Sequence, residues 1–338
     1  MPTIAIDAMG GDFAPAAVVK GVAQVSMSTD ILCVLVGDER QIQEVLEETP
    51  YNAEQIDVHH ASEVIGMEED PKEGIRRKPE ASIVAATRLV KQGRADAVVT
   101  AGNTGAAVLA CVRHFPVIPG IRKTALASVY PRQIEYEGQD HLALLLDVGA
   151  TIRCEAVDLV HFALMGSAYA RRISKIEAPQ VALLNMGREE SKGGEVMVEA
   201  HRRLRTLPGM NFVGNIEGHE LATGRADVVV CEGFLGNVVL KLLEGLSEMM
   251  GDLAASAAQQ NWRWKLGLAM LSGGVGRLRE LTDYARYGGA PILGFEHLLI
   301  KAHGRSTELA IGNAVKVAAK AVRDQVPGEI KAAIQQVR

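Results

Sequence analysis

The chain has 338 residues, 48% of them apolar, and a formal net charge of -5 at pH 7. Such a chain can bury a large core, as one α/β domain or two lobes, and its acidic balance argues against non-specific binding to nucleic acid. No apolar run approaches the roughly 20 residues that cross a bilayer, and the opening residues do not form a signal peptide, so we expect a cytoplasmic protein.

The first predicted element is a strand over Thr3–Asp7, which ends on an acid. Asp7 and Asp12 flank the paired glycines Gly10 and Gly11, and a helix is predicted from about 16 to 26. The pattern lacks the G-x-G-x-x-G fingerprint of dinucleotide-binding folds. Two interpretations stay open: an acid-capped turn, and a ligand crevice at the end of the strand.

A glycine turn between the predicted strand Ala97–Val99 and a helical pattern over Ala106–Arg113 is the main candidate for an anion site. Glycines let the backbone approach a ligand closely, and the start of a helix offers unpaired N–H groups. The alternative is a plain strand-to-helix turn in which Thr104 caps the helix. The four residues of this turn are Gly102, Asn103, Thr104 and Gly105.

Several further predicted strands also end on a polar residue with glycine close behind, as at Asp147, Asn185 and Glu232. Because the carboxyl ends of parallel strands meet at one edge of a sheet, at least five such ends predict a shared crevice. We therefore predict one α/β/α sandwich over residues 1–338, with a mostly parallel sheet. The later strands are predicted at 31–37, 124–129, 141–147, 180–185, 211–218 and 226–231, with a turn at 287–291 and a long helix at 308–322.

An apolar stripe at helical spacing, flanked by Arg and Lys, occupies Trp262–Leu281. It suits a helix on an anionic membrane surface, and equally a dimer contact or a core helix. The glycines of Ser272–Gly276 predict a break in this helix. We expect a protruding helical hairpin around 252–286.

The cysteines do not form a metal or disulfide pattern, and we expect them to be reduced. They are Cys33, Cys111, Cys154 and Cys231. A Ser/His nucleophile pair of His303 and Ser306 is possible by residue type, but no strand-borne G-x-S-x-G accompanies it. Basic clusters that could receive an acidic partner protein lie at 171–175, 202–205 and 76–78, although each also suits a solvated helix face.

Taken together, the loops resemble the PlsX family, the acyl-ACP:phosphate acyltransferases of bacterial phospholipid synthesis. The match runs in order from residue 2 to about 325. Glu232 stands where the family usually has Asp, and Thr151 where it usually has Asn. The matching motifs are Asp7-Ala-Met-Gly-Gly-Asp12, Ala101-Gly-Asn-Thr-Gly-Ala106, Asp147-Val-Gly-Ala150, Leu184-Asn-Met-Gly187 with Lys192-Gly193, Gly214-Asn-Ile-Glu-Gly218, Glu232-Gly-Phe-Leu-Gly-Asn-Val238, Tyr287-Gly-Gly-Ala-Pro291 and His303-Gly-Arg-Ser306.

The resemblance implies that inorganic phosphate attacks the thioester of a fatty acyl-[acyl carrier protein], giving acyl phosphate without a metal or cofactor. It implies a fold similar to the phosphotransacetylases and the isocitrate/isopropylmalate dehydrogenases. It also implies a homodimer, peripherally associated with an anionic membrane, that supplies a membrane acyl-phosphate:glycerol-3-phosphate acyltransferase. The alternative is an NAD-dependent decarboxylating dehydrogenase of the related fold, which needs a metal-binding acidic cluster that we cannot place.

On this hypothesis the glycine turn at 102–105 holds the phosphate, because the protein must mainly bind and aim a nucleophile that is already competent. Lys192 is the predicted balancing cation, with Arg188 as the alternate. Asn185 or Asn237 stabilises the oxyanion, and His303 protonates the leaving thiolate. The other residues expected to bind phosphate or the acyl substrate are Asp7, Gly10, Gly11, Asp147, Glu232, Gly236 and Ser306.

Overall fold

The described strands of the protein form one twisted sheet. The computed structural model describes residues 1–133, 142–260 and 288–337. Within these residues the sheet has 11 strands in the order β3-β2-β1-β4-β11-β10-β5-β6-β9-β7-β8. The strands are β1 (Thr3–Asp7), β2 (Leu32–Gly37), β3 (Ile56–His60), β4 (Ala97–Thr100), β5 (Ala125–Pro131), β6 (Leu142–Leu146), β7 (Val181–Leu184), β8 (Phe212–Ile216), β9 (Val228–Val230), β10 (Ala290–Leu293) and β11 (Leu298–Lys301).

Most neighbouring strands are parallel, which confirms the predicted sheet. The exceptions lie at its centre, where β10 runs antiparallel to both β11 and β5, and β5 runs antiparallel to β6. Strand β1 shows why both faces are covered: Ile4 and Ile6 pack into the core on one face, while Ala5 packs on the other. A strand with apolar residues on both faces belongs inside a three-layer sandwich.

Helices cover the two faces of the sheet, as predicted for an α/β/α sandwich. Helices α1, α2, α6, α7, α11 and α12 bury side chains in the core on one face. Helices α4 and α5 bury theirs on the other face, where the first turns of α8 also pack. The helices are α1 (Ala16–Ser28), α2 (Glu39–Glu47), α3 (Pro71–Arg77), α4 (Ser82–Lys91), α5 (Thr104–His114), α6 (Ala156–Tyr169), α7 (Gly194–Arg205), α8 (Gly233–Gln260), α11 (Glu308–Arg323) and α12 (Val326–Gln335).

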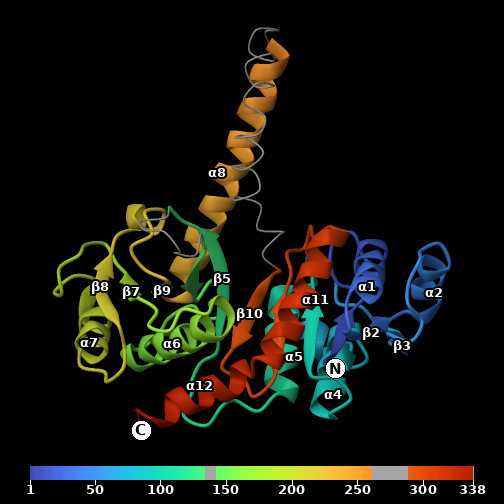
Figure 1. Ribbon diagram of the computed structural model, residues 1–338, viewed down its shortest axis with the longest axis horizontal. Coiled ribbons are helices and arrows are strands. Elements are labelled where there is room, and N and C mark those ends of the chain that lie inside the picture. The colour runs from blue at the N-terminus through green and yellow to red at the C-terminus, as the bar shows by residue number, and fades with distance from the viewer. Residues whose placement is uncertain (134–141, 261–287, 338) are drawn as a thin grey trace.

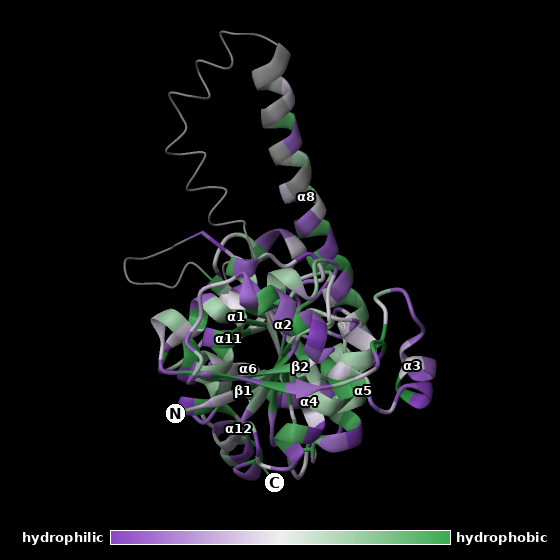
Figure 2. Ribbon diagram, turned by 90° about the vertical axis from the view of Figure 1, so that its right-hand side faces the viewer, coloured by the Kyte–Doolittle hydropathy of each residue, from purple (hydrophilic) through white to green (hydrophobic). Residues whose placement is uncertain are grey.

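Helix α8 leaves the body of the molecule and extends well beyond the sheet (Figure 1). Figure 2 shows hydrophobic residues concentrated in the sheet and hydrophilic ones on the outer helices, as expected for a buried core. The stripe at Trp262–Leu281, and with it most of the hairpin expected around 252–286, lies outside the described residues. In the described part of the chain, no helix combines the length and the apolar character that crossing a bilayer requires.

The sequence analysis missed the two central strands β10 and β11. The turn predicted at 287–291 is wrong at its end, because Ala290 and Pro291 already belong to β10. Strand β10 contains Pro291, a residue that a local pattern assigns to a turn or an edge strand rather than to the centre of a sheet. The omission matters because Lys301, the last residue of β11, reaches the candidate site described next.

Candidate functional site

A cavity of about 940 Å³ lies where the loops that follow five strands come together. The predicted crevice therefore exists, but its loops differ in part from those expected: the loops after β7 and β8 are not among its described lining, whereas the loop after β11 is. On one side it is lined by residues that follow β1, β4 and β11, and on the other by residues that follow β6 and β9. The polar or loop residues that meet there are Asp12, Thr104, Gly105, Gly149, Ala150, Thr151, Gly233, Asn237, Lys301, His303 and Ser306.

The glycine turn after β4 is organised by Asn103. The Oδ1 atom of Asn103 accepts the N–H of Ala106 at 3.1 Å, so Asn103 caps α5, and the alternative of a Thr104 cap is wrong. The Asn103 amide also donates to the carbonyl oxygens of Met67 (3.1 Å) and Glu69 (3.0 Å). Asn103 is thus occupied in holding two loops together, while Thr104 and Gly105, the first residues of α5, line the cavity. The start of a helix leaves main-chain N–H groups available to an anion.

Two glycines predicted to contact substrate are instead required by packing between loops. A Cβ atom on Gly10 would lie 2.7 Å from the main-chain nitrogen of Gly102, so the loops after β1 and β4 can approach only without side chains. A Cβ atom on Gly236 would lie 1.8 Å from the carbonyl oxygen of Asp147. Gly11 adopts a φ of 111° beside Gly304, a conformation that favours glycine. These glycines shape the cavity, and none of Gly10, Gly11, Gly102 or Gly236 lines it.

Asp147 is fully buried and organises the loop after β6. Its carboxylate accepts four main-chain N–H bonds, from Leu126 (2.9 Å), Gly149 (3.1 Å), Ala150 (3.0 Å) and Thr151 (2.8 Å). Burial raises the pKa of Asp147, while these donors favour its charged form. Because both carboxylate oxygens of Asp147 accept main-chain N–H groups, Asp147 stabilises the wall of the cavity.

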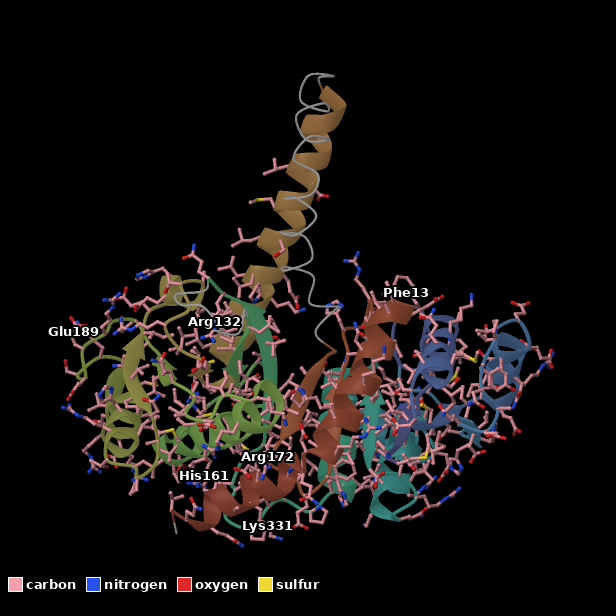
Figure 3. The ribbon with its side chains drawn as sticks, viewed as in Figure 1. Phe13, Arg132, His161, Arg172, Glu189 and Lys331 are labelled. Atoms are coloured by element: carbon pink, nitrogen blue, oxygen red, sulfur yellow. The ribbon has the colours of Figure 1, made fainter. Side chains whose placement is uncertain are left out.

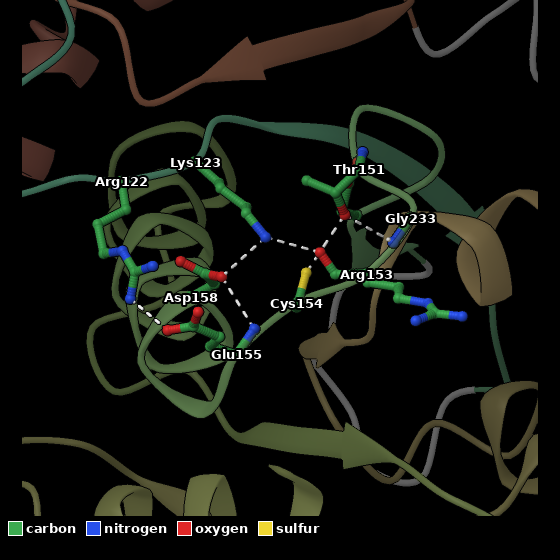
Figure 4. A network of polar contacts seen from close by, with 9 residues as sticks. Arg122, Lys123, Thr151, Arg153, Cys154, Glu155, Asp158 and Gly233 are labelled. Atoms are coloured by element: carbon green, nitrogen blue, oxygen red, sulfur yellow. Dashed lines mark hydrogen bonds and ion pairs between the residues drawn. The ribbon is translucent and has the colours of Figure 1, made fainter.

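The loop that Asp147 organises is tied to α8 and α6 (Figure 4). The hydroxyl oxygen of Thr151 accepts the N–H of Gly233 at 3.1 Å and so satisfies a donor at the start of α8. Lys123 donates to the carbonyl oxygen of Arg153 at 2.7 Å and pairs with the buried Asp158 at 3.1 Å. Thr151, which departs from the family pattern, therefore links the loop after β6 to the start of α8.

Three strand ends place their last residues in a row beneath the cavity. Asp7, Thr100 and Lys301 are register partners on β1, β4 and β11. The Thr100 hydroxyl donates to Oδ2 of Asp7 at 2.6 Å. Burial raises the pKa of Asp7, against the hydroxyls of Ser82 and Thr100, which favour its charged form. Asp7 lies in the floor under the glycine turn and does not line the large cavity.

Lys301 is a site residue that the sequence analysis missed. Its side chain lines the cavity although the residue is only 7% exposed, and its ammonium group donates to the carbonyl oxygens of Ala101 and Ala302. Burial lowers the pKa of Lys301 to about 8. The available sequence signal was a lysine directly after the apolar run Leu298–Ile300.

His303 and Ser306 both line the cavity, as the sequence predicted that they would share a site. The Nδ1 atom of His303 accepts the N–H of Arg305 at 3.1 Å, so the neutral ring carries its proton on Nε2. Burial lowers the pKa of His303, which keeps the ring neutral near pH 7. In this tautomer the ring offers a hydrogen-bond donor at Nε2, while its acceptor nitrogen is engaged by the Arg305 N–H and does not serve as a base for the Ser306 hydroxyl.

The structure does not bring the loop after β7 to the cavity. The Asn185 amide donates to the carbonyl oxygen of Lys192 at 3.0 Å, which closes that loop on itself. Arg188 pairs with Glu220 at 2.7 Å. Lys192 is exposed, and neither it nor Asn185 lines the cavity. Glu232 follows β9 without lining the cavity either, whereas Asn237, one helical turn later on α8, does line it.

None of the cysteine thiols has the environment of a nucleophile. Cys33, Cys111 and Cys231 are buried and Cys154 is half-buried. Burial raises the pKa of Cys33 to about 12 and that of Cys154 to about 11, and it also raises the pKa values of Cys111 and Cys231. A thiol with a raised pKa has little thiolate to attack a thioester.

The cavity is lined by apolar as well as polar side chains. Lys301, His303, Ser306 and Thr104 are among the polar ones. Apolar side chains from α5, β5, the loop after β6 and α8 form the remaining wall. They are Val108, Leu109, Leu126, Val129, Val148 and Leu240.

The three basic clusters predicted to receive an acidic partner are largely neutralised within the chain. Arg172, labelled in Figure 3, pairs with Glu329 at 2.6 Å. Arg202 and Arg203 both pair with Glu199. The cluster at 76–78 pairs with acids of its own loop and helix. Paired surface charges contribute less to docking than unpaired ones, so none of the three clusters is favoured.

Among the described residues, no group of three or more His, Cys, Asp or Glu is placed to hold a metal ion.

Comparisons with known proteins agree with these features. A family model described as "Fatty acid synthesis protein" matches residues 2–329. The phosphate acyltransferase of Nitratidesulfovibrio vulgaris (strain DP4) is 41% identical over 331 residues, which cover 98% of this chain and 94% of that protein. The phosphate acyltransferase of Desulfitobacterium hafniense (strain Y51) is 44% identical over 332 residues, covering 98% and 97%. A phosphotransacetylase from Streptococcus pyogenes matches in structure with a TM-score of 0.64 at 15% identity, over 95% of this chain and 94% of that one, which shows a shared fold.

Proposed function

This chain belongs to the fatty acid synthesis protein family, and on that premise we propose that it transfers a fatty acyl group from acyl carrier protein to inorganic phosphate. Membership of a family whose similar curated members are phosphate acyltransferases makes the chain an acyltransferase, and the resemblance to the PlsX family is confirmed. The acyl carrier protein as donor, and the use of the acyl phosphate for phosphatidic acid, belong to the proposal.

The observation that carries the proposal is one large cavity with both polar and apolar lining residues. Its volume of about 940 Å³ lies near the top of the roughly 300–1,000 Å³ usual for ligand sites. Lys301, Ser306 and the start of α5 suit a phosphate ion. The apolar wall formed by α5, β5 and α8 suits an acyl chain. One site can therefore hold both reactants with the thioester between them.

In the proposed reaction a phosphate oxygen attacks the thioester carbon, and the carbon–sulfur bond breaks as acyl phosphate forms. The carbonyl oxygen becomes negative in the transition state, and N–H groups at the site stabilise it. The departing thiolate is a good leaving group that takes its proton from water, while the Nε2–H of the neutral His303 ring can donate a hydrogen bond to it. Holding the two reactants in one geometry supplies most of the rate advantage, because phosphate is already a competent nucleophile.

The reaction is tested by incubating the full chain with palmitoyl-[acyl carrier protein] and phosphate, and by trapping acyl phosphate with hydroxylamine. We expect acyl phosphate and free carrier in equal amounts, with no dependence on NAD. Reduction of NAD with a 2-hydroxy acid substrate, and no acyl phosphate, would support the dehydrogenase alternative instead.

The apolar wall gives a sharper test through Val129→Phe. The larger ring should displace about two methylene groups of a long chain, at about 0.8 kcal/mol each. We expect kcat/KM for the palmitoyl substrate to fall roughly 15-fold. A butyryl substrate should be affected less than about threefold, because it does not reach the wall. The exposed Val112→Phe on α5 serves as the matched control. Equal losses with both chain lengths would show that this wall does not bind the acyl chain.

We also propose that the chain forms a homodimer through α8. The helix carries exposed apolar side chains every three or four residues, the spacing with which two helices pack along each other. These residues are Leu235, Val238, Leu242, Leu246, Met249 and Leu253. Sedimentation equilibrium should give a dimer for the wild type and for Val112→Glu, and a monomer for Leu242→Glu combined with Met249→Glu. A dimer that survives the paired substitution would contradict this interface.

The proposal includes association with an anionic membrane, where a membrane acyl-phosphate:glycerol-3-phosphate acyltransferase would take the product. It rests on the stripe at Trp262–Leu281 flanked by basic residues, which lies outside the described residues.

A further inference from the structure

We propose that Lys301 is the cation that binds the phosphate, and that Asp7 is a positioning residue that keeps Lys301 protonated. The inference rests on the proposed function, because it concerns a lysine that lines the same cavity. In this proposal Lys301 takes the role of phosphate-binding cation that the sequence assigned to Lys192, which does not line the cavity.

The position of the Lys301 ammonium group is fixed. Two of its three N–H groups have carbonyl acceptors, at Ala101 (3.1 Å) and at Ala302. Among the described residues, no ion pair joins this ammonium to a carboxylate, and the two carbonyl acceptors leave its third N–H group for a ligand. A buried charge without an ion partner is costly unless a ligand supplies one. An anion in the cavity supplies the opposite charge.

The other cations that line the described cavity are exposed to water. Lys241 is paired with Glu244 at 2.7 Å, and Lys72 and Arg305 lie at the exposed rim. Screening by water weakens an exposed charge, whereas a buried one acts through a lower effective dielectric constant. Lys301 is therefore the cation of the lining that contributes most to anion binding.

Asp7 lies two strands away from Lys301 in the same row, with Thr100 between them. Thr100 holds the Asp7 carboxylate by a 2.6 Å hydrogen bond, and its hydroxyl oxygen accepts the N–H of Gly102 at 2.9 Å. The row therefore links the acid, the glycine turn and the lysine. The negative charge of Asp7 favours the charged form of Lys301, against the desolvation that lowers its pKa.

Other charged groups near Lys301 favour or disfavour its charged form. Helix α5 and strand β10 contribute no titratable side chain to the described lining of the cavity. The groups that face Lys301 are Asp7 from β1, Asp12 from the loop after β1, Lys241 with Glu244 from α8, and His303 with Arg305 from its own loop.

The sign of the pH dependence follows from these groups. Lys301 is mostly charged below its pKa of about 8 and loses its charge as the pH rises through that value. Anion affinity should therefore be steady from pH 6.5 to 7.5 and fall by up to about tenfold per pH unit above 8. His303 does not produce this loss, because burial lowers its pKa from the ordinary histidine value, which already lies below the pH at which the loss is expected. Asp7→Asn removes a charge that raises the pKa of Lys301, so the loss should begin at lower pH.

The experiment is equilibrium binding of inorganic phosphate to the full chain at pH 7.5 by calorimetry. Binding of sulfate, whose charge is constant, is then followed from pH 6.5 to 9.5. Lys301→Met should weaken phosphate binding about 10- to 100-fold, as expected for loss of a hydrogen bond to a charged group. Lys316→Met, an exposed lysine on α11 outside the cavity lining, should bind as the wild type does.

Four outcomes would overturn the inference. They are unchanged binding in Lys301→Met, loss of binding in Lys192→Met instead, a sulfate profile in the wild type that stays flat to pH 9.5, and a profile that Asp7→Asn does not move. If Lys301→Met does not fold, the pH dependence of sulfate binding in the wild type and in Asp7→Asn still tests the inference. A wild type that forms acyl phosphate while Lys301→Met binds phosphate normally would leave the proposed function standing and reject only the role of Lys301.

Discussion

Replacement of Asp147 by alanine is expected to abolish acyl transfer and to lower the free energy of unfolding by about 3–5 kcal/mol. The carboxylate accepts four main-chain N–H groups from the strand β5 and from the loop at Gly149–Thr151. Alanine would leave these donors without their acceptor in a buried place. Urea unfolding and the acyl phosphate assay measure the two effects.

Two variants separate this role from a loss of charge alone. Asp147→Asn keeps one acceptor oxygen but points an amide donor at one set of N–H groups, so we expect intermediate losses of stability and activity. Asp252→Ala, at an exposed position on α8, should change the free energy of unfolding by less than about 0.5 kcal/mol. An Asp147→Ala protein with wild-type stability and lost activity would instead indicate that the carboxylate contacts substrate.

The parallel sheet could be predicted because most of its strands are continuous apolar runs that end on a polar residue and glycine. Such a run, as at Ala97–Thr100, is what a strand covered on both faces requires. The central strands β10 and β11 are as long as β4, but Pro291 inside β10 is typical of a turn or an edge strand and argued locally against a central strand. Their antiparallel placement is set by long-range pairing, which a local pattern does not encode.

The location of the candidate site could be predicted from the sequence, but the roles of its residues could not. Five of the site residues expected from the sequence line the described cavity: Thr104, Gly105, Asn237, His303 and Ser306. The sequence could not show that Asp147 faces its own loop, because the direction of a carboxylate depends on which N–H groups fold around it.

The sequence also could not show whether Lys192 or Lys301 reaches the cavity. A basic, glycine-rich loop looks like an anion site in any sequence, whereas a lysine after an apolar run looks like the end of a strand. Only the order of the strands decides which lysine reaches the cavity.

The second large effect is expected when phosphate is withheld. Without phosphate the enzyme should not release the carrier, because none of the candidate nucleophiles in residues 1–133, 142–260 and 288–337 is activated to take its place. The thiols of the four cysteines have raised pKa values. The His303 ring keeps its proton on Nε2 and so cannot serve as the base that a serine nucleophile needs. Turnover should stop completely and resume when phosphate is added.

Direct attack by phosphate is tested most directly by intact-protein mass spectrometry of the full chain after incubation with palmitoyl-[acyl carrier protein] alone. We expect the mass of the unmodified chain, followed by acyl phosphate formation when phosphate is added. A stoichiometric palmitoyl adduct on the chain, discharged by phosphate, would contradict direct attack and would assign a nucleophile such as Ser306 or Cys231.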